Sequence, residues 1–149
     1  MVIKKHNVIF PSQGRTLMKF LGIFYFSGYV VASDIRSDLL DNCQLNVDCN
    51  NAEINIIQSD LFENIQKDNF DVIFWNLPYY EKKELYLIPL IEQVHDYLAN
   101  DGVLLIGYNS NPLKENEIIN LVQNNRLLHY EKGIKYTWNN HIISIIKKN

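Results

Sequence analysis

The sequence has 149 residues, of which 47% are hydrophobic and 21% are charged. This length and composition are typical of one soluble globular domain, and no stretch approaches the ~20 consecutive apolar residues of a membrane span. A formal net charge of −3 disfavours tight, sequence-independent binding to a nucleic-acid backbone, which needs a dense positive surface. We therefore predict a single domain over residues 1–149, in the cytoplasm and without a membrane partner.

The cysteines and histidines do not form a metal-binding pattern. Cys43 and Cys49 are six residues apart, and the four histidines are scattered along the chain. A zinc site needs closely spaced Cys or His ligands in pairs. The sequence therefore predicts reduced thiols and no metal.

The first half of the chain alternates between strand and helix patterns. The predicted elements are, in order, a strand at Val8–Phe10 ending at Pro11, a buried helix at Thr16–Phe26, a strand at Tyr29–Ser33 ending in Asp34, an amphipathic helix at Ser37–Val47, and a strand at Glu53–Gln58. Leu39, Leu40, Cys43 and Val47 share one face of that amphipathic helix.

The second half continues the alternation and then ends in two strands. The predicted strands are Phe70–Trp75, Val103–Ile106, Leu128–Tyr136 and His141–Lys147. A helix is predicted at Leu85–Ala99; its regular part starts at Pro89, and Asp101-Gly102 ends it. A second helix is predicted to start at Asn111-Pro112, with Ile118, Ile119 and Val122 buried. The last two strands have no helix between them, so they must be antiparallel.

This order of elements predicts the fold class. Strands that alternate with helices form a parallel sheet covered on both faces. We predict an α/β protein with a doubly wound, seven-stranded, mostly parallel sheet whose last strand is antiparallel. In such sheets, ligands bind outside the carboxyl ends of the strands.

Three predicted strands end in polar residues, namely Asp34, Asp60 and Asn76. An acidic residue after the second strand can accept hydrogen bonds from both hydroxyls of a ribose. The alternative for Asp34 and for Asp60 is a structural one, in which each carboxylate caps the helix that follows it.

The sequence Asn76-Leu77-Pro78-Tyr79 suits a planar substrate nitrogen, whose lone pair is delocalised. Acceptors on its N–H groups, the Asn76 Oδ1 and the Leu77 carbonyl, favour a tetrahedral nitrogen that can attack an electrophilic methyl group. Pro78 fixes the backbone, and Tyr79 offers a ring for stacking. The alternative is an ordinary turn after a strand.

The segments Val30–Ile35, Leu40–Asn46, Gln58–Phe62, Phe70–Tyr79 and Leu98–Ile106 together resemble class I S-adenosylmethionine-dependent methyltransferases with a Rossmann-like fold. The likeness is to the small-domain, N-P-P-Y-type group, which modifies protein glutamine amides, adenine amines or similar nitrogens. The resemblance implies that S-adenosylmethionine is the cofactor, with Asp34 at its ribose and Asp60 and the Leu61 backbone at its adenine. Ile35 and Asn76 would also contact the cofactor, and Asn76–Tyr79 would hold the target nitrogen.

The chain departs from this family at the loop after the first strand, which is normally glycine-rich. Here Phe10–Thr16 contains one glycine, Gly14, and no acidic residue. Two alignments remain open. In the first, Val8–Phe10 is the family's first strand and Pro11–Arg15, with Gly14, is a degenerate cofactor loop. In the second, Phe10–Leu17 matches the segment usually found upstream, and the first strand and its loop are deleted before Leu21-Gly22-Ile23.

Three functions are compatible with these residues. The first is an N-methyltransferase whose acceptor is a protein, a nucleic-acid base or a small molecule with a planar nitrogen, with a partner subunit as one source of substrate recognition. The second is an inactive methyltransferase-fold binding protein, motivated by the missing glycine loop. The third is a nucleotide-sugar or dinucleotide Rossmann protein, which Asp34 permits. The absent glycines count against it, and it leaves Asn76–Tyr79 unexplained.

Overall fold

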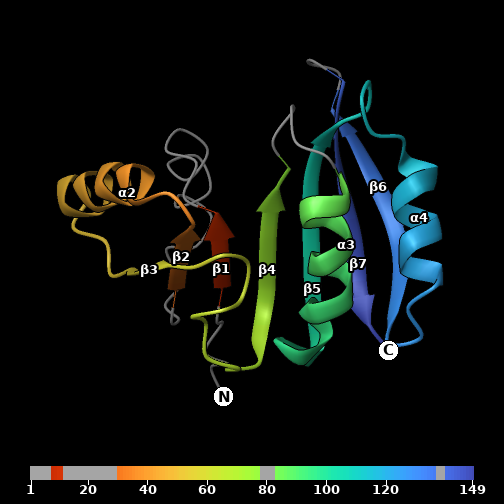
Figure 1. Ribbon diagram of the computed structural model, residues 1–149, viewed down its shortest axis with the longest axis horizontal. Coiled ribbons are helices and arrows are strands. Elements are labelled where there is room, and N and C mark those ends of the chain that lie inside the picture. The colour runs from red at the N-terminus through yellow and green to blue at the C-terminus, as the bar shows by residue number, and fades with distance from the viewer. Residues whose placement is uncertain (1–7, 12–29, 78–82, 137–139) are drawn as a thin grey trace, which may run out of the picture. The chain divides into compact units, whose positions relative to one another are not determined.

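The computed structural model describes residues 8–11, 30–77, 83–136 and 140–149, and its elements are shown in Figure 1. The chain divides into two compact units, Met1–Gln66 and Lys67–Asn149, and each is described by itself. The predicted helix at 16–26 lies outside the described residues. The predictions of a single domain and of one continuous seven-stranded, doubly wound sheet stay predictions.

The described residues of the first unit contain three parallel strands. They are β1 (Val8–Pro11), β2 (Val30–Asp34) and β3 (Asn55–Gln58), in the order β3-β2-β1. β1 pairs with β2 from Val8 opposite Val30, and β2 pairs with β3 up to Asp34 opposite Gln58. All three predicted strands are confirmed. Because Val8–Pro11 is a parallel strand beside β2, the alignment that makes it the first strand of the fold is the one supported.

Helix α2 (Ser37–Cys49) follows β2 and packs on β2 and β3. Leu40, Cys43 and Val47 are buried, and their spacing of three and four residues places them on one side of the helix. This is the apolar face that the sequence predicts, with Leu39 at its half-buried margin. The helix ends two residues beyond the predicted Val47.

Four strands lie in the part of the second unit that the structure describes. They are β4 (Phe70–Asn76), β5 (Leu98–Asn109), β6 (Leu128–Tyr136) and β7 (His141–Lys148), in the order β4-β5-β7-β6. β4 and β5 are parallel, whereas β7 is antiparallel to both of its neighbours. The predicted antiparallel strand pair at the end of the chain is therefore confirmed.

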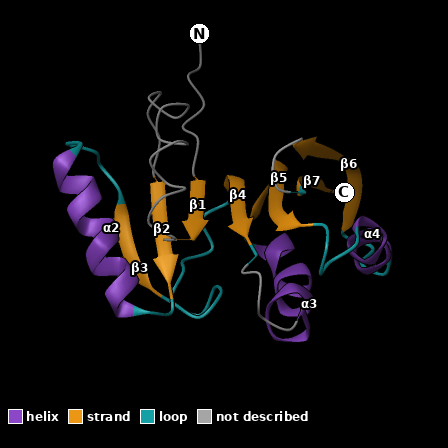
Figure 2. Cartoon of the chain, turned by 90° about the horizontal axis from the view of Figure 1, so that it is seen from above, coloured by secondary structure: helices purple, strands orange, loops and turns teal. Residues whose placement is uncertain are grey.

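Helices α3 (Lys83–Gln93) and α4 (Glu115–Gln123) lie on one side of this second sheet (Figure 2). Leu104, Ile106 and Tyr108 alternate along β5 and are almost completely buried, as expected for residues on one face of a strand. The core of the second unit therefore includes this face of β5.

A chain of polar side chains crosses that core. The Tyr130 hydroxyl donates to Glu115 Oε1 at 2.6 Å and lies 3.2 Å from Ser144 Oγ, which donates in turn to the Tyr108 hydroxyl at 3.4 Å. Burial, followed by the bond to Glu115, raises the pKa of Tyr130, so this hydroxyl keeps its proton. The network links β5, β6, β7 and α4, because each of its polar groups needs its neighbour as a hydrogen-bond partner.

The prediction that α3 starts at Pro89 is wrong. The helix begins at Lys83, contains Pro89, ends at Gln93, and is followed by a short 3₁₀ helix at Val94–Asp96. Leu87, Leu90, Ile91 and Val94 are buried around the proline. Their packing outweighs the hydrogen bond that the proline cannot make, because tertiary contacts override local propensity.

β5 is longer than predicted, and Asp101-Gly102 lies inside it rather than before it. Phe70 pairs with Leu98, but Val72 pairs with Val103, so β5 carries an irregularity between these two pairs. A Cβ on Gly102 would lie 2.7 Å from the Phe70 carbonyl oxygen and 2.9 Å from the Ala99 nitrogen. The glycine is therefore required by a close backbone approach, not by a turn that ends a helix.

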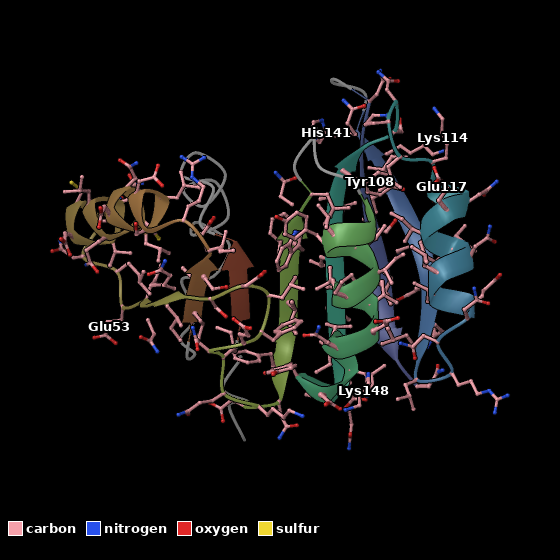
Figure 3. All side chains as sticks on the ribbon, viewed as in Figure 1. Glu53, Tyr108, Lys114, Glu117, His141 and Lys148 are labelled. Atoms are coloured by element: carbon pink, nitrogen blue, oxygen red, sulfur yellow. The ribbon has the colours of Figure 1, made fainter. Side chains whose placement is uncertain are left out.

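The prediction that α4 starts at Asn111-Pro112 is also wrong, because the helix begins at Glu115. The Asn109 side chain accepts a hydrogen bond from the Asn111 nitrogen at 2.8 Å, which forms a turn before the helix. Glu117 then accepts from the Lys114 nitrogen at 3.1 Å, and both residues lie at the start of α4 (Figure 3). Ile118 and Val122 are buried as predicted, and Ile119 is half-buried.

Candidate functional site

The predicted site residues fall in both units. Asp34, Ile35, Asp60 and Leu61 belong to the first unit, whereas Asn76 and Leu77 belong to the second. Gly14, Pro78 and Tyr79 lie outside the described residues. The two groups are therefore described separately, as the β2–β3 end and the β4 end.

The β2–β3 end is formed by Asp34, Ile35 and residues 58–64. Asp34 is the last residue of β2, and its Oδ1 accepts a hydrogen bond from the Arg36 nitrogen at 3.0 Å. The N-cap of α2 is Arg36 itself, so the alternative of Asp34 as the helix cap is wrong. The Asp34 carboxylate instead orders the turn between β2 and α2 at the carboxyl end of the sheet.

Two hydrogen bonds join the ends of β2 and β3. The Ser59 nitrogen donates to the Asp34 carbonyl at 3.0 Å, and Gln58 Nε2 donates to the Ile35 carbonyl at 3.0 Å. The Ile35 side chain is 50% exposed. A carboxylate, an exposed apolar side chain and the start of the Asp60 loop thus lie side by side at this end. Sequence reasoning missed Gln58, whose only signal is its position as the last residue of the strand.

Asp60 and Leu61 lie in a turn after β3. The Glu63 nitrogen donates to the Asp60 carbonyl at 3.0 Å, and no helix follows in the described residues 61–66. The alternative of Asp60 as a helix cap is therefore wrong. Leu61 has a φ of +47°, a left-handed conformation that is uncommon for a residue other than glycine, asparagine or aspartate.

The first unit also contains Cys43, near the acidic end of β2. Burial, and secondarily the charge of Asp34, raises the pKa of the Cys43 thiol. Cys43 is fully buried and Cys49 is exposed, and both are free. Cys43 is therefore a protonated core side chain rather than a nucleophile.

The β4 end is formed by Asn76 and Leu77 together with Gly107 on β5. Asn76 is the last residue of β4 and pairs with Gly107. The Leu77 nitrogen donates to the Gly107 carbonyl at 2.8 Å. A Cβ on Gly107 would lie 3.0 Å from Asn76 Oδ1 and 3.6 Å from the Phe74 ring. A side chain at position 107 would therefore crowd the Asn76 carboxamide oxygen, which would have to shift to make room.

Sequence reasoning missed Gly107. The available signal is a single glycine inside the apolar strand pattern that runs from Val103 to Tyr108, since such a glycine marks a close approach. The same sheet end carries the start of β7 at His141, whereas Lys148 marks the opposite end of that strand (Figure 3).

The described residues show neither a metal-binding cluster nor a membrane-spanning helix. Within the described ranges, no group of three or more His, Cys, Asp and Glu side chains is arranged to hold a metal ion. None of the helices in the same part of the chain has both the length and the apolar composition needed to span a membrane.

Comparison with known proteins identifies the family. A family model described as "Methyltransferase small domain" matches residues 24–137, which is most of the chain. The protein therefore belongs to the methyltransferase small-domain family. This match confirms the predicted class.

Solved structures share the fold. A ribosomal protein L11 methylase from Lactobacillus delbrueckii subsp. bulgaricus matches with a TM-score of 0.79 at 19% identity, over 99% of this chain and 72% of the other. A methyltransferase from Pyrococcus furiosus matches with a TM-score of 0.78 at 20% identity, over 97% and 76%. A TehB-like SAM-dependent methyltransferase from Corynebacterium glutamicum matches with a TM-score of 0.71 at 15% identity, over 100% and 83%. The chain therefore has the Rossmann-like methyltransferase fold.

Proposed function

We propose that the protein is an S-adenosylmethionine-dependent N-methyltransferase that acts on a planar nitrogen. The observation that carries the proposal is the hydrogen-bonded joining of the β2 and β3 ends, which sets Asp34 beside the Asp60 loop. The family and the fold support methyl transfer. The Corynebacterium protein, named as SAM-dependent, supports the cofactor.

The residues of the β2–β3 end fit the adenosine part of this cofactor. The Asp34 carboxylate has about four acceptor positions, so it can accept the Arg36 nitrogen and also the hydroxyls of a ribose. The exposed Ile35 side chain offers an apolar surface for the flat adenine. Asp60 and the Leu61 backbone offer polar groups for the adenine edge. When bound, S-adenosylmethionine supplies an electrophilic methyl group.

The β4 end is suited to hold the acceptor nitrogen. Asn76 Oδ1 and the Leu77 carbonyl each accept a hydrogen bond from an N–H of the acceptor, which favours a tetrahedral nitrogen with an available lone pair. The Leu77 bond to Gly107 fixes the backbone that carries the second acceptor. Fixed acceptors need no reorganisation during the reaction, and this lowers its barrier. Pro78 and Tyr79 are proposed to complete this end by fixing the backbone and by stacking. Gly14 is proposed for the cofactor loop.

The acceptor class follows from this chemistry. A protein glutamine amide, an adenine amine and a small molecule with a similar nitrogen each present a planar N–H₂ group to Asn76. We also propose that a partner subunit helps to recognise the substrate. We propose a cytoplasmic location for the protein.

Calorimetric titration of the full chain with S-adenosylmethionine tests the cofactor half. We expect measurable binding that weakens about 100-fold in Asp34→Ala, which corresponds to about 2.7 kcal/mol. The control is Asp41→Ala, which removes an exposed carboxylate of α2 and should leave the affinity unchanged. Folded wild-type protein that takes up no cofactor at millimolar concentration would exclude the proposal.

Radiolabelled methyl transfer to N-acetylglutamine amide and to adenosine tests the acceptor half. We expect transfer to one of the two, and its loss in Asn76→Ala with the cofactor affinity retained. Cofactor binding without transfer to any nitrogen acceptor would leave the inactive, cofactor-binding relative as the better description.

A further inference from the structure

Leu61 has the least favourable backbone conformation among the described non-glycine residues with positive φ. Four such residues occur, of which three are asparagines (Asn51, Asn69 and Asn140) and the fourth is Leu61 at +47°. Asparagine tolerates the left-handed region because its short polar side chain bonds locally, whereas leucine has no such compensation. An unfavourable conformation of this kind persists only where the surroundings enforce it, and it is concentrated at functional sites.

The Ser59 side chain supplies that enforcement. Its hydroxyl donates to the Leu61 carbonyl at 3.1 Å and accepts from the Asn64 nitrogen at 3.0 Å. Ser59 is 4% exposed, so both bonds are shielded from water. One side chain thus spans the turn from Leu61 to Asn64 and uses both the donor and an acceptor of its hydroxyl.

The loop closed by Ser59 is also fixed to the strand before it. Asn64 Nδ2 donates to the Gln58 carbonyl at 2.8 Å, and the Ser59 nitrogen donates to the Asp34 carbonyl. The base of the loop therefore shares its anchoring with the end of β2. The turn at Leu61 is set by these contacts and not by the conformational preference of the residue that occupies it.

We propose that Ser59 is a positioning residue for the cofactor, which acts by holding Leu61 in the left-handed conformation that aims its backbone at the adenine. This inference rests on the proposed function of the β2–β3 end. Without the hydroxyl, Leu61 relaxes to an ordinary negative φ and its N–H and carbonyl turn away. The binding partner affected is S-adenosylmethionine, through its base rather than its methyl group.

The affinity of the full chain for S-adenosylmethionine, measured by calorimetry, tests the proposal. We expect Ser59→Ala to bind about tenfold more weakly than wild type. Adding Leu61→Asn to Ser59→Ala should recover part of that loss, because asparagine adopts the left-handed region at three other positions within the described ranges. The control is Ser144→Ala, which removes another buried serine hydroxyl, far along the chain in the second unit, and should leave the affinity unchanged.

Three outcomes overturn the proposal. The first is an unchanged affinity for S-adenosylmethionine in Ser59→Ala. The second is an equal loss of affinity in Ser144→Ala, which would indicate general destabilisation. The third is a double variant that circular dichroism shows to be folded but whose affinity does not recover.

A measurement without ligand separates this inference from the proposed function. The intraresidue nuclear Overhauser effect between the Leu61 amide and α-protons, measured by NMR, reports the sign of φ, because the two protons lie closer together at positive φ than at negative φ. We expect this effect to weaken in Ser59→Ala and to keep its wild-type strength in Ser144→Ala. If wild type fails to bind the cofactor, the proposed function fails. An unchanged effect at Leu61 in Ser59→Ala means instead that Ser59 does not hold the loop.

Discussion

The β2–β3 end and the β4 end are stabilised in opposite ways. At the first, polar side chains reach backbone groups across the turn, as Gln58 does to Ile35 and Ser59 to Leu61. At the second, Gly107 leaves the room that the Asn76 side chain takes, and a Cβ added there would lie 3.0 Å from Asn76 Oδ1. The first end is therefore sensitive to the loss of atoms, and the second is sensitive to their addition.

The strands that lead to the two ends differ in the same sense. β1, β2 and β3 have only four, five and four residues, so few hydrogen bonds between strands hold their ends. Side chains from the loops supply further hydrogen bonds to these ends. β5 has twelve residues and pairs with β4 and β7. A long strand paired on both sides holds its backbone firmly, so an added side chain on it has to displace its neighbours.

The largest expected effect lies on β5, at Gly102. In Gly102→Ala the new Cβ would lie 2.7 Å from the Phe70 carbonyl oxygen, a contact with backbone that cannot rotate away. We expect the free energy of unfolding to fall by about 2–3 kcal/mol, measured by urea titration with circular dichroism. Asn100→Ala, an exposed neighbour, should change it by less than about 0.5 kcal/mol. Equal stability of the two variants would show that β5 is not rigid at this point.

The sequence predicts the fold better than it predicts where elements begin. Six of the seven strands of the described residues begin and end within two positions of the prediction, because β-branched runs and apolar alternation depend on burial that the fold then provides. The seventh, β5, begins five residues earlier than predicted. The wrong predictions are those at Pro89, Asp101-Gly102 and Asn111-Pro112. There, a residue with a strong local preference predicts the start or end of an element. In each case, packing or a side-chain bond decided the boundary instead.

The candidate site shows the same limit. Asp34, Asp60 and Asn76 are visible from the sequence because each follows an apolar strand. Ser59, Gln58 and Gly107 are not, because their roles depend on partners that become neighbours only in the folded chain. Motif residues can therefore be predicted from the sequence, whereas the residues that hold them in place can be identified only in the folded structure.

The next expected effect concerns Gly107 at the β4 end. In Gly107→Ala, Asn76 Oδ1 must move by a few tenths of an ångström to relieve a 3.0 Å contact. We expect a loss of about 1 kcal/mol in unfolding free energy, and about tenfold slower methyl transfer with unchanged cofactor affinity, because the acceptor oxygen is displaced.

A double-mutant cycle tests whether this effect passes through Asn76. In an Asn76→Ala background the carboxamide oxygen is gone, so Gly107→Ala should cost almost nothing in unfolding free energy. Additive costs in the two backgrounds would contradict the role of Gly107 as the space for Asn76.

The smallest expected effect lies at the β2–β3 end, at the bond between Gln58 Nε2 and the Ile35 carbonyl. Gln58→Leu keeps the size of the side chain and removes this bond, which is partly replaced by water because both groups are near the surface. We expect a loss of about 0.5–1 kcal/mol in unfolding free energy and about threefold weaker binding of S-adenosylmethionine. Gln44→Leu is the matched control, because Gln44 Nε2 makes one exposed bond to Asp48 within α2, away from the strand ends. If both variants bind the cofactor equally well, the β2–β3 end does not depend on side-chain bonds, and the contrast with the β4 end is lost.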